Sequence, residues 1–177
     1  MDASENIRLI KKAIRGNPDA YGELIRLHQE YLYKIAFLYT KNEQDALDLV
    51  GSAILKGYQN IRTLKNPEWF RTWLTRILIN TAKDEQKKLV YYDSIDPEML
   101  SERYQAVSLE ERLDLTAAIM QLSEKYRTAI VLKYFSGLSI REMAFVMNSP
   151  EGSVKAYLSR ARGELKKILK EDYFYAN

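Results

Sequence analysis

The sequence lacks cysteine and has a single histidine, His28, with only seven glycines and four prolines among its 177 residues. Without cysteine the chain can form no disulfide, no catalytic thiol and no cysteine-ligated zinc site. One histidine has no second histidine to complete an ordinary metal site, so we interpret His28 as a packing or surface residue. The sequence therefore indicates no metal, no cofactor and no catalytic residue.

Long apolar runs are also missing. No stretch of about 18 apolar residues is present, and the N-terminus does not resemble a signal peptide. We therefore expect a soluble, cytoplasmic protein that does not insert into membranes. The apolar fraction of 46% is high enough for a real core, and the length suits one or two small domains.

The four prolines predict helix starts. Each follows a residue type that caps helices, in the pairs Asn17-Pro18, Asn66-Pro67, Asp96-Pro97 and Ser149-Pro150. No convincing alternating strand pattern remains beside these helices. The predicted fold class is all-α, with two small helical domains joined by an acidic linker.

The first domain, residues 1–89, is predicted to contain helices at 3–15, 18–39, 43–58 and 67–88. Apolar residues at spacings of three and four predict the buried stripes. For 18–39 these are Leu24, Leu27, Tyr31, Ile35 and Leu38; for 43–58, capped by Asn42, they are Ala46, Leu49, Val50, Ala53 and Ile54; for 67–88 they are Phe70, Leu74, Ile77, Leu78 and Thr81.

The linker is expected at residues 90–107, with a possible helical turn after Pro97. Residues 89–114 carry seven Asp/Glu and two Lys/Arg, a balance of −5 between two basic segments. Such a run is often only a solvated tether, and that interpretation stays open here.

The second domain, residues 108–177, is predicted to contain helices at 108–121, 124–135, 139–147 and 150–170. Ser108 with Glu111 forms a candidate capping box, Ser123 can cap the next helix, and Gly137 can end it. Ser139 with Glu142 forms another capping box, and Ser149-Pro150 opens the last helix. The last two helices, joined by so short a turn, are a helix-turn-helix candidate.

The last helix has a buried stripe and a cationic outer face. Its predicted stripe is Val154, Leu158, Ala161, Leu165 and Ile168. Residues 151–170 hold six Lys/Arg and two Asp/Glu, a local balance of +4 in a chain whose total is +3. This concentration suits phosphate neutralisation in a DNA groove. The alternative is an ordinary amphipathic surface helix.

Residues 62–88 combine cations with aromatic rings. Seven Lys/Arg stand against three Asp/Glu, together with Trp69, Phe70 and Trp73. Cations can follow phosphates while rings stack on bases, so this composition suits single-stranded DNA. Trp73 shares helical spacing with Phe70 and Leu74 and is interpreted as core. Asn80 and Asp84 lie one turn apart and could be a plain surface pair, although asparagine is also a competent reader of base edges.

These motifs together resemble the extracytoplasmic-function (ECF) sigma factors of bacterial RNA polymerase, over nearly the whole chain. Residues 122–134, 137–144 and 152–162 resemble the family's C-terminal helix-turn-helix segment. Residues 45–50 resemble the start of its polymerase-contacting helix. Residues 70–74 with Asn80, Asp84, Lys87 and Lys88 resemble its segment for melting and reading the −10 element.

The resemblance implies three sets of site residues. For the −35 element they are Ser153, Lys155, Ala156, Ser159, Arg160 and Arg162. For the −10 element and melting they are Trp69, Arg71, Arg76, Asn80, Lys83, Asp84, Lys87 and Lys88. For the polymerase they are Asp45, Asp48 and Leu49. The acidic residues near the start of 43–58 could instead simply favour the helix dipole.

The chain departs from the family pattern at two places. Gly51 and Ser52 stand where a glutamine and an acidic residue are common, which puts the grip on the polymerase clamp in question. Lys87 and Lys88 replace arginines, so they keep the charge but lose the bidentate fork, and a phosphate contact is favoured over a base contact.

The resemblance implies a sigma factor that binds core RNA polymerase and promoter DNA, with an anti-sigma factor as regulator. By the same resemblance the acidic linker could run through the channel that RNA later occupies. An alternative is a helix-turn-helix regulator that binds duplex DNA without the polymerase, and another is a helical adaptor. An enzyme is not predicted, because no nucleophile–base set, phosphate loop or metal cluster stands out.

Overall fold

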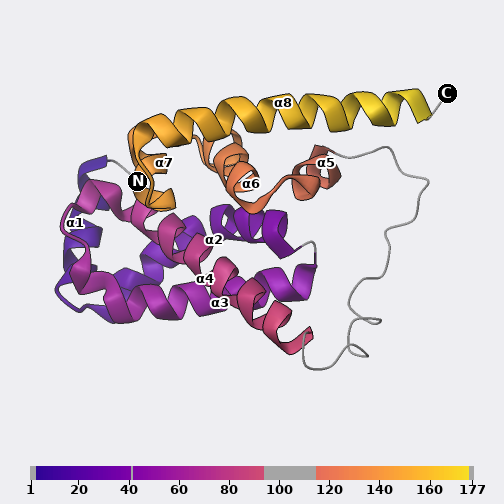
Figure 1. Cartoon of the computed structure of the whole chain (residues 1–177). Coiled ribbons are helices and arrows are strands. Elements are labelled where there is room, and N and C mark those ends of the chain that lie inside the picture. Colours follow the sequence, from indigo (N-terminus) through magenta and orange to yellow (C-terminus); the bar gives the residue numbers. More distant parts are fainter. Residues whose placement is uncertain (1–2, 41, 94–114, 176–177) are drawn as a thin grey trace.

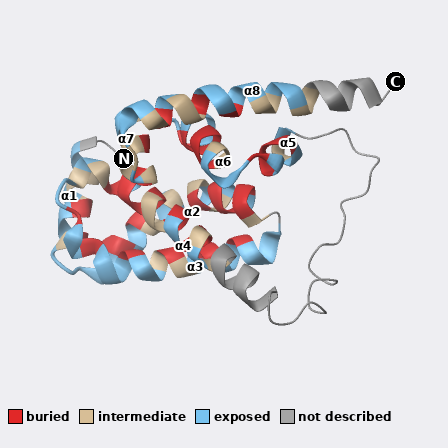
Figure 2. Ribbon diagram, in the orientation of Figure 1, coloured by how far each residue is buried: buried red, intermediate tan, exposed pale blue. Residues whose placement is uncertain are grey.

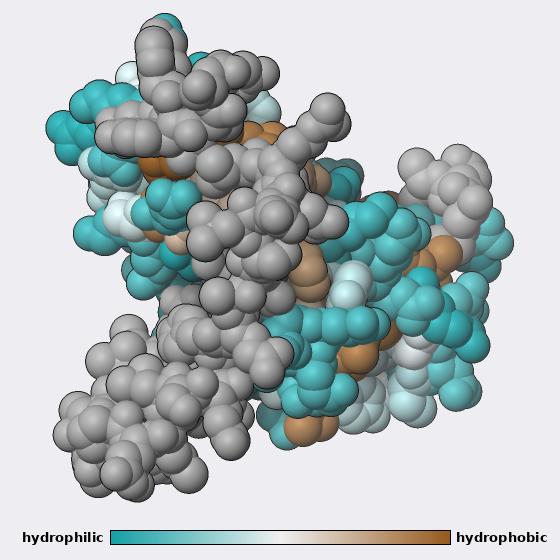
Figure 3. Space-filling view, turned by 90° about the vertical axis from the view of Figure 1, so that its right-hand side faces the viewer, coloured by the Kyte–Doolittle hydropathy of each residue, from teal (hydrophilic) through white to brown (hydrophobic). Residues whose placement is uncertain are grey.

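A computed structural model describes residues 3–40, 42–93 and 115–175, with side chains described for 4–40, 42–85 and 115–169. This part of the chain is helical throughout its regular structure and contains no strand, which confirms the all-α prediction (Figure 1). None of the helices in the described ranges has the length and apolarity needed to cross a membrane. Figure 3 shows a described surface that is mostly hydrophilic, with apolar side chains in separate patches.

The N-terminal group of helices comprises α1 (Ala3–Ile14), α2 (Pro18–Thr40), α3 (Glu43–Asn60) and α4 (Phe70–Asp93). Short 3-10 turns, η1 (Ile61–Thr63) and η2 (Pro67–Trp69), join α3 to α4. Asparagine side chains cap three starts: Asn17 accepts from the Ala20 amide at 2.8 Å, and Asn42 and Asn66 cap α3 and η2 in the same way. These caps leave fewer amides unsatisfied at the helix starts.

The core of this group lies where α2, α3 and α4 meet (Figure 2). Leu24, Leu32, Phe70 and Leu74 are each at most 1% exposed. Gly57 lets two helices approach closely, because a Cβ there would collide with the Tyr21 hydroxyl. That hydroxyl donates to the Ile54 carbonyl at 2.8 Å, so an alanine at 57 would disturb a buried hydrogen bond.

The C-terminal group comprises α5 (Leu115–Gln121), α6 (Glu124–Ile130), α7 (Ile140–Met147) and α8 (Glu151–Tyr175). Ser139 and Glu142 form the predicted capping box at the start of α7. Asn148 ends α7 in the left-handed region, with φ 49°, which turns the chain sharply into α8. The predicted helix-turn-helix is therefore present as α7 and α8.

Several helix ends differ from the predictions. The 124–135 helix changes at Val131–Phe135 into a π-helical turn, η4, which Gly137 ends with φ 67°. Ser123 stands at the start of α6, but its side chain makes no capping hydrogen bond. The Ser149 hydroxyl donates to the Met147 carbonyl, and Pro150 accepts the first bond of α8, so this helix starts one residue later than predicted.

Two further predictions need correction. Leu27, assigned to a buried stripe, is 52% exposed, because the neighbouring His28 packs against Phe70 in its place. Helix α4 runs to Asp93, past the predicted end at 88 and into the expected linker. No glycine or proline interrupts residues 89–93, so nothing local stops the helix there. The rest of the linker, the turn after Pro97 and the Ser108–Glu111 capping box lie outside the described residues.

Candidate nucleic-acid interface

Helix α8 presents a cationic face opposite a buried stripe. Val154, Leu158 and Ala161 are at most 6% exposed, whereas Leu165 and Ile168 are half-buried. The predicted −35 residues occupy the remaining surface: Lys155, Ser159, Arg160 and Arg162 are exposed, and Ser153 and Ala156 are half-buried. A helix with its cations on the solvent side and its apolar side on α6 and α7 is positioned like a recognition helix.

Helix α4 is in a different situation, because several predicted −10 residues contact the C-terminal group. The rings of Trp69 and Phe145 meet edge to face, with centroids 5.4 Å apart. The Arg76 guanidinium lies 4.5 Å from the centre of the Phe145 ring. Arg141 in turn lies 5.6 Å from the centre of the Trp69 ring. Aromatic and cation–π contacts therefore join the start of α4 to α7.

Polar contacts extend this junction along α4. Arg71 donates to the Ser136 carbonyl at 2.9 Å while its guanidinium stacks 4.1 Å from the centre of the Tyr31 ring. Lys83 forms an ion pair with Glu124 of α6 at 3.0 Å. From α2, the buried Tyr39 hydroxyl donates to the hydroxyl of Thr128 at 2.9 Å. The two helical groups are thus joined from the start of α4 to its middle.

Glu142 has two roles in this junction. One carboxylate oxygen accepts from the backbone amide and hydroxyl of Ser139, which completes the cap of α7. The other accepts from the buried Thr72 hydroxyl of α4 at 2.8 Å. Desolvation raises the pKa of Glu142, but these hydrogen bonds and the charge of Arg71 outweigh it and leave the pKa below the usual value.

Other predicted −10 residues lie outside the junction. Asn80 and Asp84 are exposed, and Asp84 comes within 3.8 Å of Lys56 on α3. Trp73 is 8% exposed and packs beside Phe70, which confirms its assignment to the core. Lys87 and Lys88 belong to α4, but their side chains lie outside the described part.

The predicted polymerase residues on α3 separate into two kinds. Asp45 and Asp48 are exposed near the start of the helix. Leu49 is 1% exposed, so its side chain supports the core and offers no contact surface, and the expectation of a direct contact is corrected. The sequence analysis overlooked Leu47 and Leu55, which are 50% and 58% exposed, each four residues from Gly51.

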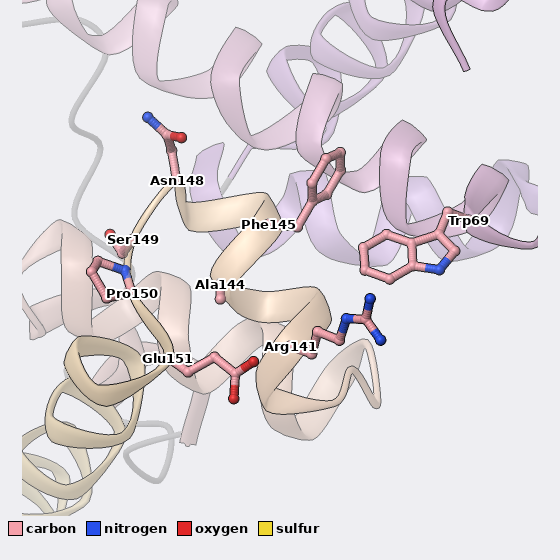
Figure 4. Close-up of a pocket in the computed structure, with 8 residues that line it drawn as sticks. All are labelled: Trp69, Arg141, Ala144, Phe145, Asn148, Ser149, Pro150 and Glu151. Carbon is pink, nitrogen blue, oxygen red and sulfur yellow. The ribbon is translucent and has the colours of Figure 1, made fainter. Parts of the chain in front are cut away.

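An open cavity lies beside the junction, with a volume of about 570 Å³. Figure 4 shows Trp69 and Phe145 on one side, with the Arg141 guanidinium directed towards the tryptophan. Its lining residues are Trp69, Arg141, Ala144, Phe145, Asn148, Ser149, Pro150 and Glu151. The turn between α7 and α8 therefore lies close to Trp69. Sequence analysis missed Phe145 and Arg141 as partners of Trp69 because helical spacing carries no signal for contacts between distant segments.

Comparison with known proteins gives a consistent family. A family model for sigma-70 region 2 matches residues 24–89, and one for sigma-70 region 4 matches residues 112–165. RNA polymerase sigma factor SigV of Bacillus subtilis is 35% identical over 153 residues, covering 82% of this chain and 89% of that protein. ECF RNA polymerase sigma factor SigW of the same organism is 30% identical over 178 residues, covering 92% and 95%.

Two solved structures share the fold at 24% identity. Sigma factor RpoE of Bartonella quintana, in complex with the anti-sigma factor NepR, gives a TM-score of 0.73 over 85% of this chain and 96% of that one. CnrH, in complex with the cytosolic domain of CnrY, gives 0.70 over 94% and 98%. The helix-turn-helix, the cationic helices and these likenesses define a promoter-recognition protein. The chain belongs to the ECF sigma factors of bacterial RNA polymerase, and it directs promoter-specific transcription initiation.

Proposed function

We propose that residues 108–177 form the domain that recognises the −35 element through α8. The observation that carries this proposal is the exposed cationic face of α8 above a buried stripe. Lys155, Ser159 and Arg160 are long enough or suitably polar to reach base edges, whereas Ala156 and Gly163 leave room for close approach. Ser153 and Arg162 lie beside them and would add phosphate contacts.

Residues 1–89 form the second proposed unit, which melts and reads the −10 element. Trp69 would stack on an unpaired base, while Arg71, Arg76 and Lys83 would follow the phosphates. Asn80 and Asp84, exposed one turn apart, would read a base edge. Lys87 and Lys88 extend the cationic line by sequence.

Core RNA polymerase is the proposed partner of α3. Asp45 and Asp48 offer exposed carboxylates to a basic surface, and the exposed Leu47 and Leu55 supply apolar contact on the same helix. Gly51 lies between these two leucines, so a partner can come close where larger side chains are common in the family. This arrangement replaces the role first assigned to Leu49.

The protein carries out no catalysis in this proposal, because the polymerase forms the phosphodiester bonds. Family membership supports cytoplasmic action and an anti-sigma factor as regulator. RpoE of Bartonella quintana and CnrH were each solved with a regulatory partner, although their identity to this chain is too low to transfer the binding mode.

Run-off transcription tests the proposal. Core polymerase is incubated with genomic DNA fragments, with and without the full chain, and the transcripts are mapped. New start sites that depend on the chain are expected. Tight, sequence-specific binding of duplex DNA by the chain alone, without any effect on the polymerase, would contradict the proposal.

A further inference from the structure

The junction between the two helical groups covers most of the side chains proposed to melt DNA. Of the six whose side chains are described, Trp69, Arg71, Arg76 and Lys83 each contact the C-terminal group. Asn80 and Asp84 do not belong to those contacts and are exposed. The stacking and phosphate-binding side chains are therefore engaged, while the proposed base readers remain at the surface.

Each of these contacts uses the group that DNA would use. The Trp69 ring lies edge to face against Phe145 and has Arg141 over it, so a base cannot stack there in this arrangement. The guanidinium of Arg76 faces the Phe145 ring, and the Lys83 ammonium pairs with the carboxylate of Glu124. The carboxylate occupies Lys83 as a phosphate would.

We infer that α7 and the start of α6 compete with single-stranded DNA for one face of α4, so that the free chain masks its own −10 surface. This inference rests on the proposed function of α4. In the closed state the chain keeps single-stranded affinity low, and separation of the two groups exposes the surface. Binding to the polymerase, which must place two promoter elements apart, is the event that would favour separation.

The individual contacts are of a kind that a partner can displace. The Lys83–Glu124 pair is partly exposed, and such pairs stabilise weakly. Phe145 is half-buried, so its ring contacts are also open to solvent on one side. Only a fraction of open molecules can bind DNA, and the apparent dissociation constant rises as that fraction falls. Weakening the junction should therefore strengthen single-strand binding by the free chain.

A reversible crosslink provides the main test, because the natural chain has no thiol. Cysteines replace Lys83 and Glu124, and a short bismaleimide with an internal disulfide joins them. Binding of a fluorescent, mixed-sequence single-stranded oligonucleotide is measured before and after reductive cleavage of the linker. Each single-cysteine variant, treated with the same reagent, controls for modification alone.

We expect at least about tenfold weaker oligonucleotide binding in the crosslinked chain, with recovery on cleavage. Equal binding before and after cleavage would overturn the inference. Failure of the two thiols to join, although each reacts singly, would also overturn it. If instead the cleaved protein behaves as expected but never supports initiation with core polymerase, the proposed function fails while the masking stands.

A gain of binding supplies an independent test. Phe145→Leu removes the ring that contacts both Trp69 and Arg76 but keeps an apolar side chain. The free variant should bind the oligonucleotide about threefold to tenfold more tightly than the natural chain. Tyr134→Leu is the matched control, since Tyr134 is 58% exposed and belongs to the same helical group. Unchanged or weaker binding by Phe145→Leu, with helicity retained, would contradict the inference.

Discussion

The two DNA-facing helices have the same charge balance and opposite surroundings. Residues 62–88 and 151–170 each have a local balance of +4. On α8, Lys155, Arg160 and Arg162 are exposed. On α4, Arg71, Arg76 and Lys83 contact a backbone carbonyl, a phenyl ring and a carboxylate of the other helical group. Equal charge therefore gives unequal access.

The difference follows from how each helix packs. Helix α8 rests on α5, α6 and α7 with one side only, so its polar side faces solvent. Helix α4 lies in the middle of the molecule and contacts α2, α3 and α7 (Figure 1). A helix surrounded on several sides uses its polar side chains within the fold. Charge indicates what a surface can bind, and packing decides whether the surface is available.

The largest effect should come from the exposed face. Arg160→Ala should weaken −35 recognition, since a lost base contact costs about 1–3 kcal/mol and relaxes selectivity at one position. Binding of promoter duplex by the polymerase complex is the measurement, and Lys167→Ala, on the exposed side of the same helix, is the control. Core binding should be unchanged. Normal selectivity at every promoter would show that the proposed orientation of α8 is wrong.

The next effect concerns a base reader that the junction leaves exposed. Asn80→Ala should alter −10 selectivity and impair initiation on duplex promoters, because the amide can no longer bind a base edge. Permanganate reactivity of −10 thymines measures opening. A premelted template should recover a variant defective only in opening more fully than one defective in reading. Unchanged reactivity in Asn80→Ala would remove this residue from the site.

A smaller effect is expected from an arginine within the junction. Arg76→Ala removes a phosphate contact, which weakens DNA binding, and also removes the contact with Phe145, which opens the molecule. The two consequences oppose each other in the free chain, so its single-strand affinity should change by less than about threefold. In the Phe145→Leu background the same substitution should only weaken binding. A large loss in both backgrounds would contradict the masking.

Local signals predicted much of the fold. Asparagine caps at 17, 42 and 66 and the Ser139–Glu142 box correctly located helix starts, because a cap depends on neighbours within one turn. Periodicity correctly placed the stripes of α3 and α8. It failed at Leu27, because the available neighbour, Phe70, lies far along the chain and contacts His28.

The candidate site was less predictable for the same physical reason. The cations and aromatic residues of α4 were visible as a composition, but their partners Phe145, Ser136 and Glu124 come from another helical group. Leu49 shows a related difficulty, since motif similarity pointed to a contact while its apolar spacing placed it in the core. Only the packing of distant helices decides between such alternatives.

The smallest effect concerns acid. Because the pKa of Glu142 is depressed in the folded chain, its ionised form is the one that the junction stabilises. This contribution is present above the ordinary glutamate pKa of 4.5 and is lost as the pH falls through the depressed value. Arg71 is the charged neighbour and keeps its charge throughout, and the Lys83–Glu124 pair would also weaken when its carboxylate is protonated. Oligonucleotide binding by the free chain should therefore stay level from pH 7 to pH 5 and strengthen below about pH 4.5. Glu142→Gln isolates this carboxylate, since it should raise binding modestly at neutral pH and leave a shallower acid response from Glu124 alone. Identical acid responses in the two proteins would exclude Glu142 as a determinant of closure.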